Sequence, residues 1–347
     1  MRLRVSRVLL AAVLALGLGG CGDSSPVLNA VGSYSDVAIL TDLDLFNPVA
    51  FQLKQALEVD ANTGIRREPM LRVDIFDFDA KDDARLYKNV IVIGYLKGKD
   101  GASREIRRRL GGTQMKVMES RHLFFAARED VYANNQNVLF LAGSDRSFMQ
   151  SAINQEAPAL RGQIEEMNRE RVMEYMLGLG RNAEAERSLR ENAGIRMTVP
   201  EGYRINGIKQ NAEGDLGMVE VLHENPTRGV VVFWKTLEDP EAFDMEDPEA
   251  LLALRRRWGT FLDEALQDLY GYTWSTEMFR GEPRPQLAGM YEVLSAQVGG
   301  PFRTLFLLDE PSRRLFGINW FTYNPQGDKH PYLREARAVA GTFVPRS

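Results

Sequence analysis

The sequence predicts an α+β fold in which two α+β domains, each a mixed or antiparallel sheet with helices on one face, are joined by a long helical segment. The chain has 347 residues, more than a single hydrophobic core comfortably supports. Short apolar runs and amphipathic helical patterns occur on both sides of a charged, helix-rich stretch. These observations place an N-terminal domain at 34–145, a helical connector at 146–193 and a C-terminal domain at 194–347.

In the first domain, compact or alternating apolar runs predict five strands, at 37–40, 71–78, 90–93, 122–126 and 138–142. Asn47 followed by Pro48 has the residue types of a helix N-cap and first helical position, so a helix is expected to begin there. A second, arginine-rich helix is expected at 103–110. This order of elements predicts a sheet with its helices on one face.

The connector is expected to be helical to about Asn192, with Pro158 marking a break or kink. Its apolar stripe predicts a helix packed on the neighbouring domains rather than a coiled coil. Beyond it, alternating runs predict a meander of strands covered by two helices. One helix begins at Asp247 and Pro248, and the other begins near Pro331.

Trp258 lies in the middle of the apolar stripe of the first of these helices, seven positions after Leu251 and seven before Ala265. This spacing predicts that the indole covers a sheet face in the core. The arginines at 255–257 favour the alternative, in which Trp258 lies on the surface as a contact for a partner or a glycan.

The first 20 residues have the organisation of a bacterial lipoprotein signal peptide. Three arginines precede an apolar run at 8–16 that is too short to span a bilayer, and Leu18-Gly19-Gly20-Cys21 resembles a lipobox. We therefore expect cleavage before Cys21, lipidation of its thiol, and a short tether at 21–33. An ordinary signal peptide with a chance cysteine is the alternative.

Acyl chains of the palmitate kind on Cys21 bury enough methylene groups to hold the protein on a membrane, provided that more than one is attached. Gly22 follows the cysteine where an aspartate would favour retention in the inner membrane. The expected location is therefore the cell envelope, facing the periplasm, and the outer membrane rather than the inner membrane.

The composition excludes several kinds of chemistry and of binding partner. Cys21 is the only cysteine, so its acylation leaves no disulfide, no cysteine-ligated metal and no cysteine nucleophile. The formal net charge of −5 offers no general attraction to nucleic acid. With 26% charged and 44% hydrophobic residues, the chain is expected to fold rather than stay disordered.

Candidate catalytic residues are few. The three histidines, His122, His223 and His330, share no metal-ligand spacing, and no Gly-x-Ser-x-Gly motif supplies a nucleophile. Ser144 follows a predicted strand and opens a helix, a position that fits a nucleophile elbow or an anion site but also a simple helix cap. No catalytic residue is therefore assigned.

Three further patterns have both a functional and an ordinary interpretation. The segment 94–100 resembles a P-loop but is one residue too short and lacks the Ser or Thr for Mg²⁺. The aspartates between Asp74 and Asp83 are dense enough for Ca²⁺, yet the EF-loop pattern fails, and a solvated strand end is the default. The arginine triplets at 107–109 and 255–257 are interpreted as charged helix faces, with anion or lipid-headgroup sites as the alternative. No metal or cofactor is expected.

Taken in order, three motifs resemble a family of uncharacterised Gram-negative envelope lipoproteins that is known only as a domain of unknown function. The motifs are the lipobox, Asn89-Val90-Ile91-Val92-Ile93 followed by Asp130-Val131-Tyr132-Ala133-Asn134-Asn135-Gln136-Asn137-Val138, and Val199-Pro200-Glu201-Gly202-Tyr203. The second half is also similar to the PsbP/Mog1-like α+β sandwich, which has a Pro-x-Gly-aromatic turn near its start. Neither resemblance implies a catalytic residue.

The sequence thus predicts a membrane-anchored envelope lipoprotein that acts as a non-enzymatic binding or assembly factor. Its expected partners are membrane lipid, through acylated Cys21, and other envelope proteins, but not nucleic acid. The alternative is a periplasmic hydrolase with a site assembled between the two domains, for which His122, His223 and the aspartates of 74–83 are the first candidates.

Overall fold

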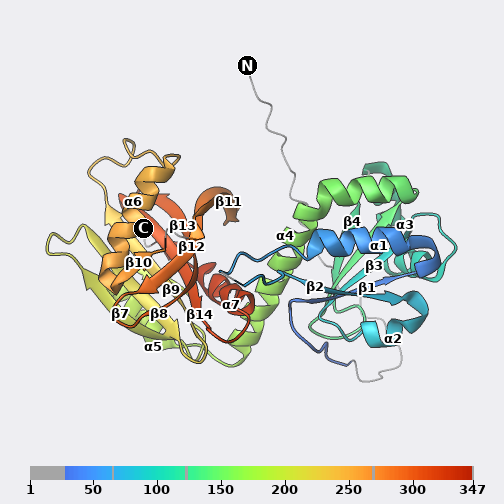
Figure 1. Cartoon of the computed structure of the whole chain (residues 1–347), viewed down its shortest axis with the longest axis horizontal. Coiled ribbons are helices and arrows are strands. Elements are labelled where there is room, and N and C mark those ends of the chain that lie inside the picture. The colour runs from blue at the N-terminus through green and yellow to red at the C-terminus, as the bar shows by residue number, and fades with distance from the viewer. Residues whose placement is uncertain (1–27, 65, 122–123, 268–269, 346–347) are drawn as a thin grey trace, which may run out of the picture.

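The computed structural model describes residues 28–64, 66–121, 124–267 and 270–345. Cys21, the signal peptide and His122 lie outside these described residues. The described chain forms two domains that lie side by side, with the long helix α4 running between them (Figure 1). Both domains combine helices with sheets, so the predicted α+β class is confirmed.

The first domain is built on a five-stranded sheet in the order β2-β1-β3-β5-β4. The first four strands in this order are parallel to their neighbours, and β4 is antiparallel to β5. The strand bounds are β1 Asp36–Thr41, β2 Arg72–Asp77, β3 Asn89–Tyr95, β4 Phe125–Glu129 and β5 Asn137–Gly143.

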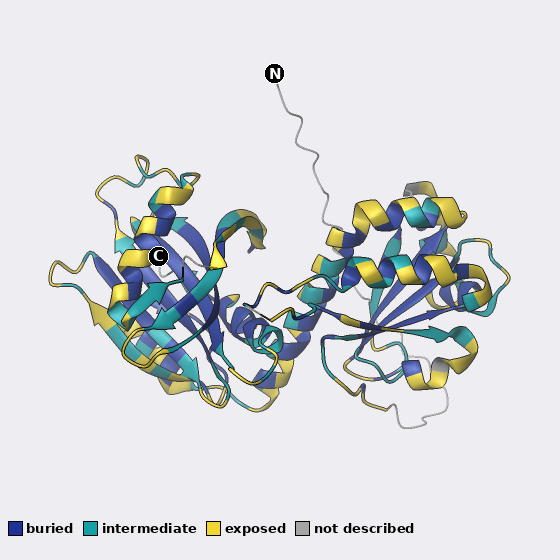
Figure 2. Cartoon of the chain, in the orientation of Figure 1, coloured by how far each residue is buried: buried dark blue, intermediate teal, exposed yellow. Residues whose placement is uncertain are grey.

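Helices cover both faces of this sheet, so the predicted arrangement with helices on one face is wrong. A core cluster on one face includes residues of α1 (Leu43–Leu57) and α4 (Arg146–Gly178). A second cluster on the other face includes residues of α2 (Lys81–Ala84) and α3 (Gly101–Arg121). The physical reason is that β3 and β5 are buried along both faces, as Figure 2 also shows, and a parallel sheet of this kind needs cover on each side.

The first helix begins earlier than its sequence signals indicate. It starts at Leu43, immediately after β1, and Pro48 lies inside it rather than at its first position. Asn47 is therefore not the N-cap, and the prediction was wrong by one turn. The added turn contains Phe46, which is fully buried with its ring 4.3 Å from that of Tyr95. Burial of this ring outweighs the local capping signal.

The asparagines of the motif at 89–93 and 130–138 have a structural role at the amino ends of the parallel strands. Asn137 donates from Nδ2 to the Oδ1 atoms of Asn89 and Asn168, both at 3.1 Å. Asn89 and Asn168 in turn donate to the Tyr34 carbonyl, at 2.9 and 2.7 Å. This buried network ties β3, β5 and α4 to the chain just before β1.

The helix α4 belongs to both domains. Its first half packs in the core of the first domain, whereas Val172 and Met176 pack in the core of the second. Two short helical segments follow and join that second core, α5 (Ala183–Ser188) and η2 (Leu189–Ala193). The predicted helical stretch therefore exists, and it packs on both neighbours as expected.

The second domain is built on an eight-stranded antiparallel sheet in the order β10-β12-β13-β14-β9-β8-β7, with β11 also paired to β12. A separate two-stranded sheet joins β6 and β15. The strand bounds are β6 Ile195–Arg196, β7 Arg204–Gln210, β8 Leu216–His223, β9 Thr227–Thr236, β10 Glu264–Leu266, β11 Thr273–Phe279, β12 Glu282–Val293, β13 Val298–Asp309, β14 Arg314–Tyr323 and β15 Val344–Pro345.

One face of this sheet is covered by α7 (His330–Ala340) together with α4 and α5, and the other by α6 (Pro248–Gly259). Asp247 caps α6 as predicted, because its Oδ1 accepts hydrogen bonds from the N–H groups of Glu249 and Ala250. The helices therefore lie on both faces here too, since alternate side chains of the central strands are apolar in both directions.

Trp258 of α6 is fully buried, so its predicted place in the core is confirmed. Its ring stacks on Phe233, 5.4 Å away, and its Nε1 donates to the Trp234 carbonyl at 3.3 Å. Arg255, one helical turn earlier, is also fully buried instead of lying on a charged face. It pairs with Glu264 at 2.8 Å.

Candidate functional site

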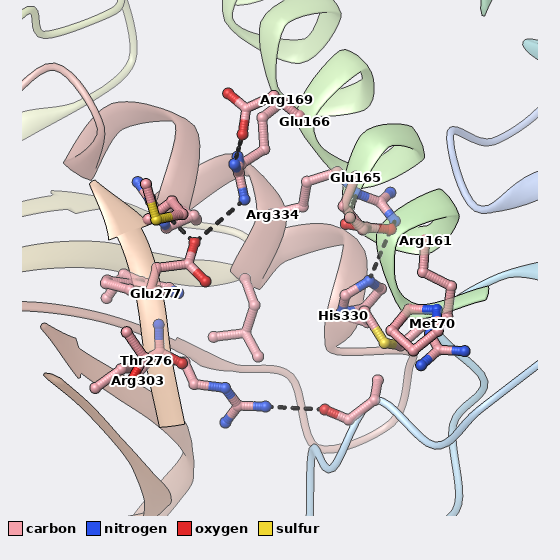
Figure 3. A pocket seen from close by; sticks show the side chains of 18 residues that line it. Met70, Arg161, Glu165, Glu166, Arg169, Thr276, Glu277, Arg303, His330 and Arg334 are labelled. Carbon is pink, nitrogen blue, oxygen red and sulfur yellow. Dashed lines mark hydrogen bonds and ion pairs between the residues drawn. The ribbon is translucent and has the colours of Figure 1, made fainter. Parts of the chain in front are cut away.

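A cavity of about 570 Å³ lies where the two domains meet. We call it the interdomain cavity; Figure 3 shows the side chains around it. Its walls come from α4 and the segment 58–71 of the first domain, and from α7 and strands β11 to β14 of the second. The lining residues are Ala61, Met70, Pro158, Arg161, Gly162, Glu165, Glu166, Arg169, Thr276, Glu277, Met278, Gln286, Arg303, Trp320, His330, Leu333, Arg334 and Arg337.

The segment 58–71 is fixed to the second domain through Glu68, which caps α7. The Glu68 carboxylate accepts hydrogen bonds from the backbone N–H of Lys329, at 2.9 Å, and of His330, at 2.7 Å. Thr63 donates its hydroxyl to the same carboxylate at 2.7 Å. A negative charge at a helix N-terminus is favourable because it meets unpaired N–H groups and the positive end of the helix dipole. One wall of the cavity is thereby held in place.

Arg303 on β13 holds the same segment from the left in the view of Figure 3. Its Nη2 donates to the carbonyls of Ala61, at 2.9 Å, and Asn62, at 3.2 Å. Burial lowers the pKa of Arg303 to about 10, and Glu277 opposes that shift in part. The guanidinium therefore stays charged at neutral pH although none of its described hydrogen bonds goes to a carboxylate.

Glu165 of α4 joins the two domains at the back of the cavity. Its carboxylate accepts hydrogen bonds from Arg334 of α7, Nε at 3.0 Å and Nη2 at 2.7 Å, and lies 3.5 Å from Nε2 of His330. Arg334 also donates to the Ser35 hydroxyl at 3.2 Å. Burial opposes ionisation of Glu165, but Arg334 and His330 outweigh it and hold the pKa of that carboxyl far below its usual range.

The carboxylate of Glu277 on β11 forms ion pairs with two arginines from two different helices. Its Oε1 is 3.2 Å from Nη2 of Arg337 and 3.5 Å from Nη1 of Arg169. Arg169 also pairs with Glu166 on its own helix. Burial lowers the pKa of both arginines, and for Arg169 the nearby charge of Arg337 adds to this effect.

The charges that line the cavity do not balance. Five arginines and three glutamates are present, and the glutamates pair with Arg169, Arg334 and Arg337. The described hydrogen bonds of Arg161 and Arg303 go to backbone carbonyls only. Burial lowers the pKa of both. The cavity therefore holds an excess of positive charge, which an anion would compensate.

Of the two histidines that the structure describes, His330 lines the interdomain cavity and His223 does not. His223 lies on β8, where its ring contacts that of Tyr203, 5.1 Å away, below the turn at Gly202. Its Nδ1 is buried without a hydrogen-bond partner. Ser144 donates to the neighbouring Asp145, which caps α4. These candidates are not brought together.

The predicted aspartate cluster lies at the end of β2, outside the cavity. Asp74 accepts a hydrogen bond from the Tyr87 hydroxyl at 2.8 Å, and Asp77 accepts one from the Leu43 N–H at 3.2 Å. Asp82 lies 3.4 Å from Arg85. Among the described residues, no group of three or more His, Cys, Asp or Glu side chains is placed to hold a metal ion.

The loop that resembles a P-loop is filled by its own side chains. Ser103 accepts the Tyr95 N–H at 2.8 Å and donates to Asp100 at 2.5 Å, while Asp100 accepts the Ser103 N–H at 2.7 Å. A Cβ added at Gly98 would come within 2.3 Å of the Ser103 hydroxyl. The Asp100 carboxylate therefore occupies the helix N-terminus at which a phosphate would bind.

The fold and the cavity define a two-domain α+β protein with an arginine-rich cavity between its domains. A family model described as a domain of unknown function, DUF4837, matches residues 182–342, which begin at the N-cap of α5 and end just before β15. A comparison with curated proteins finds no match. None of the described helices is both long and apolar enough to cross a membrane.

Proposed function

We propose that this protein is a lipid-anchored envelope lipoprotein that acts as a binding factor, with the interdomain cavity as its binding site. The anchor rests on the basic start, the short apolar run and Leu18-Gly19-Gly20-Cys21. The binding role rests on the excess positive charge in the cavity, which is the observation that carries the proposal. The outer membrane is the proposed location, because Gly22 replaces the aspartate that favours inner-membrane retention.

The second domain is proposed to be of the PsbP/Mog1-like kind. Three features support this resemblance: an antiparallel sheet between helices on both faces, a C-terminal helix, and the turn at Pro200. In that turn Gly202 has φ +85°, and Tyr203, which follows, is buried. Only glycine adopts this conformation without strain, which accounts for the Pro-x-Gly-aromatic pattern. The resemblance is one of fold and supplies no activity.

The hydrolase alternative gains no support from the described residues. His223 is packed against Tyr203 and does not line the cavity, and Asp74 and Asp82 of the aspartate cluster have partners of their own. Within the cavity, the described partner of the His330 ring is Glu165, which is already bound by Arg334. A binding role therefore fits this arrangement better than a nucleophile and base acting together.

We expect Cys21→Ala to release the protein from membranes without changing its melting temperature, because the anchor is covalent lipid and not a structural thiol. The measurement is fractionation of cell envelopes into membrane and soluble parts, with a thermal melt of the released chain. Unchanged membrane association would contradict the proposed anchor. Loss of the thermal transition would show that Cys21 has a structural role instead.

The binding role is tested by filling the cavity. Gly162 lies on α4 in the cavity wall, and a Cβ added there would meet no atom within 4 Å. We expect Gly162→Trp to fold normally and to lose any small molecule that native mass spectrometry finds bound to the wild-type protein purified from membranes. Gly178→Trp is the matched control, since Gly178 also lies on α4 in open space but does not line the cavity. Equal occupancy in both variants would refute the cavity as the binding site.

A further inference from the structure

The two arginines without a carboxylate partner lie against the same short piece of the first domain. Arg161 donates from Nη1 to the carbonyl of Ala56, and Arg303 donates from Nη2 to those of Ala61 and Asn62. Arg161 comes from α4, whereas Arg303 comes from β13 of the other domain. In Figure 3 the two side chains approach the cavity from different sides, Arg303 from the lower left and Arg161 from the right.

Each of these arginines keeps hydrogen-bonding capacity after its carbonyl contacts are counted. A guanidinium has five N–H donors, and Arg161 has one described bond. Carbonyl oxygens are dipoles and do not neutralise the positive charge of these partly buried side chains. An oxyanion does so, and it accepts the remaining N–H groups in pairs. A neutral sugar or a metal cation would leave this charge uncompensated, so neither fits.

Part of the remaining wall is apolar. Met278 of β11 has 59% of its surface exposed and lines the cavity, together with Met70, Pro158, Trp320 and Leu333. A small inorganic ion would leave the exposed side chain of Met278 in water. A volume of about 570 Å³ is within the range of sites that take a small organic molecule.

We propose that the interdomain cavity binds an organic oxyanion, a molecule with one carboxylate or phosphate head held by Arg161 in a cavity whose positive charge Arg303 increases, and with an apolar body against Met278. This inference rests on the proposed function, in which the cavity is a binding site, and it adds the chemical class of the ligand.

The test measures binding of four probes to the full-length protein in a neutral detergent by isothermal titration calorimetry. The probes are phenyl phosphate, 3-phenylpropionate, the neutral 3-phenylpropanol and inorganic phosphate. We expect both organic anions to bind, with an affinity that falls as salt is added, and the alcohol and inorganic phosphate to bind at least tenfold more weakly. The stronger of the two organic anions identifies a phosphate or a carboxylate as the natural head.

Arg161→Gln is expected to weaken binding of the organic anions by about tenfold or more, because a charge-assisted hydrogen bond and one charge are lost. Arg146→Gln is the matched control. Arg146 also lies on α4 and donates to a backbone carbonyl of α1, that of Leu45 at 2.9 Å, but it is exposed and outside the cavity. A thermal melt of each variant checks that both are folded.

Equal binding of the acid and the alcohol, or equal loss in the two arginine variants, would overturn the ligand class. So would the absence of binding by either organic anion. The proposed function is judged separately by Gly162→Trp: if that variant loses a co-purified molecule while the anion probes fail, the cavity is a binding site for another chemistry. If the probes bind but Gly162→Trp does not affect them, the anion site lies outside the cavity and the inference is wrong.

Discussion

Replacing Trp258 with alanine is expected to lower the free energy of unfolding of the second domain by about 3–5 kcal/mol, the usual cost of truncating a buried tryptophan. The indole is fully buried between α6 and the sheet, stacked on Phe233 at 5.4 Å and on Phe306 at 6.2 Å. Truncation leaves a void whose lining loses these contacts, and it removes the hydrogen bond to the Trp234 carbonyl. Such a loss is a large share of the stability of one domain, so its thermal transition should fall steeply or vanish.

Gly317 on β14 supplies an independent test of the same packing. A Cβ added at Gly317 would come within 2.3 Å of the Trp258 ring, so Gly317→Ala must displace the indole. We expect a destabilisation of about 1–3 kcal/mol, typical of an overpacked core. Trp274→Ala is the control, because Trp274 also stacks on Phe306, at 6.1 Å, but is only half-buried. The melting temperature of Trp274→Ala should change less than that of Trp258→Ala. An unchanged melting temperature for Trp258→Ala would contradict the core assignment.

Two similar sequence signals had different outcomes, and the difference is physical. Asp247 with Pro248 begins α6 as predicted, because the Asp247 carboxylate accepts hydrogen bonds from the N–H groups of Glu249 and Ala250. Asn47 with Pro48 lies inside α1, because the preceding turn buries Phe46 beside Tyr95, a gain of tertiary packing that a local pattern does not contain. Local capping rules thus predict helix starts well where packing does not compete.

The sheet faces show a second limit. The apolar runs at 90–93 and 138–142 predicted central strands correctly, and both are buried throughout. The number of helix-covered faces depends on the direction of each crossover, which short runs do not specify. The buried stretch of α4 was predictable as an amphipathic pattern, but its division between two cores appears only once both sheets exist.

The candidate site was the least predictable part. Its arginines come from three different elements, Arg161 from α4, Arg303 from β13 and Arg337 from α7, and each looks like an ordinary surface residue in its own segment. No sequence motif marks Glu165 or Glu277 as a site residue either. The only signal that could have pointed to the cavity is His330 beside Pro331, which marks the start of the helix that forms one wall. Interdomain sites of this kind require the fold to bring distant charges together.

The second large prediction concerns the ion pair between Glu165 and Arg334. Glu165→Gln is expected to lower the free energy of unfolding by about 3–5 kcal/mol. Arg334 is 3% exposed and makes two hydrogen bonds to this carboxylate. The amide keeps the shape of the side chain but leaves the guanidinium buried without a counter-charge. Because the pair joins α4 to α7, the loss should appear as earlier separation or melting of the two domains, measured by calorimetry.

The pH dependence gives this prediction a signature that a packing defect lacks. The folded-state pKa of Glu165 is held below the ordinary value of 4.5, since Arg334 and His330 outweigh the opposing effect of burial. The stability that this group contributes is therefore fully present above about pH 5 and is lost as the pH falls below 4.5 toward the folded-state pKa. Glu165→Gln has no such group, so the difference in unfolding free energy from the wild type should be constant above pH 5 and shrink on acidification.

The control is Glu156→Gln, which removes an exposed carboxyl group from the same helix and should have the same unfolding free energy as the wild type throughout. A difference between wild type and Glu165→Gln that does not change between pH 7 and pH 3 would mean that the carboxylate charge contributes nothing to the contact between the domains.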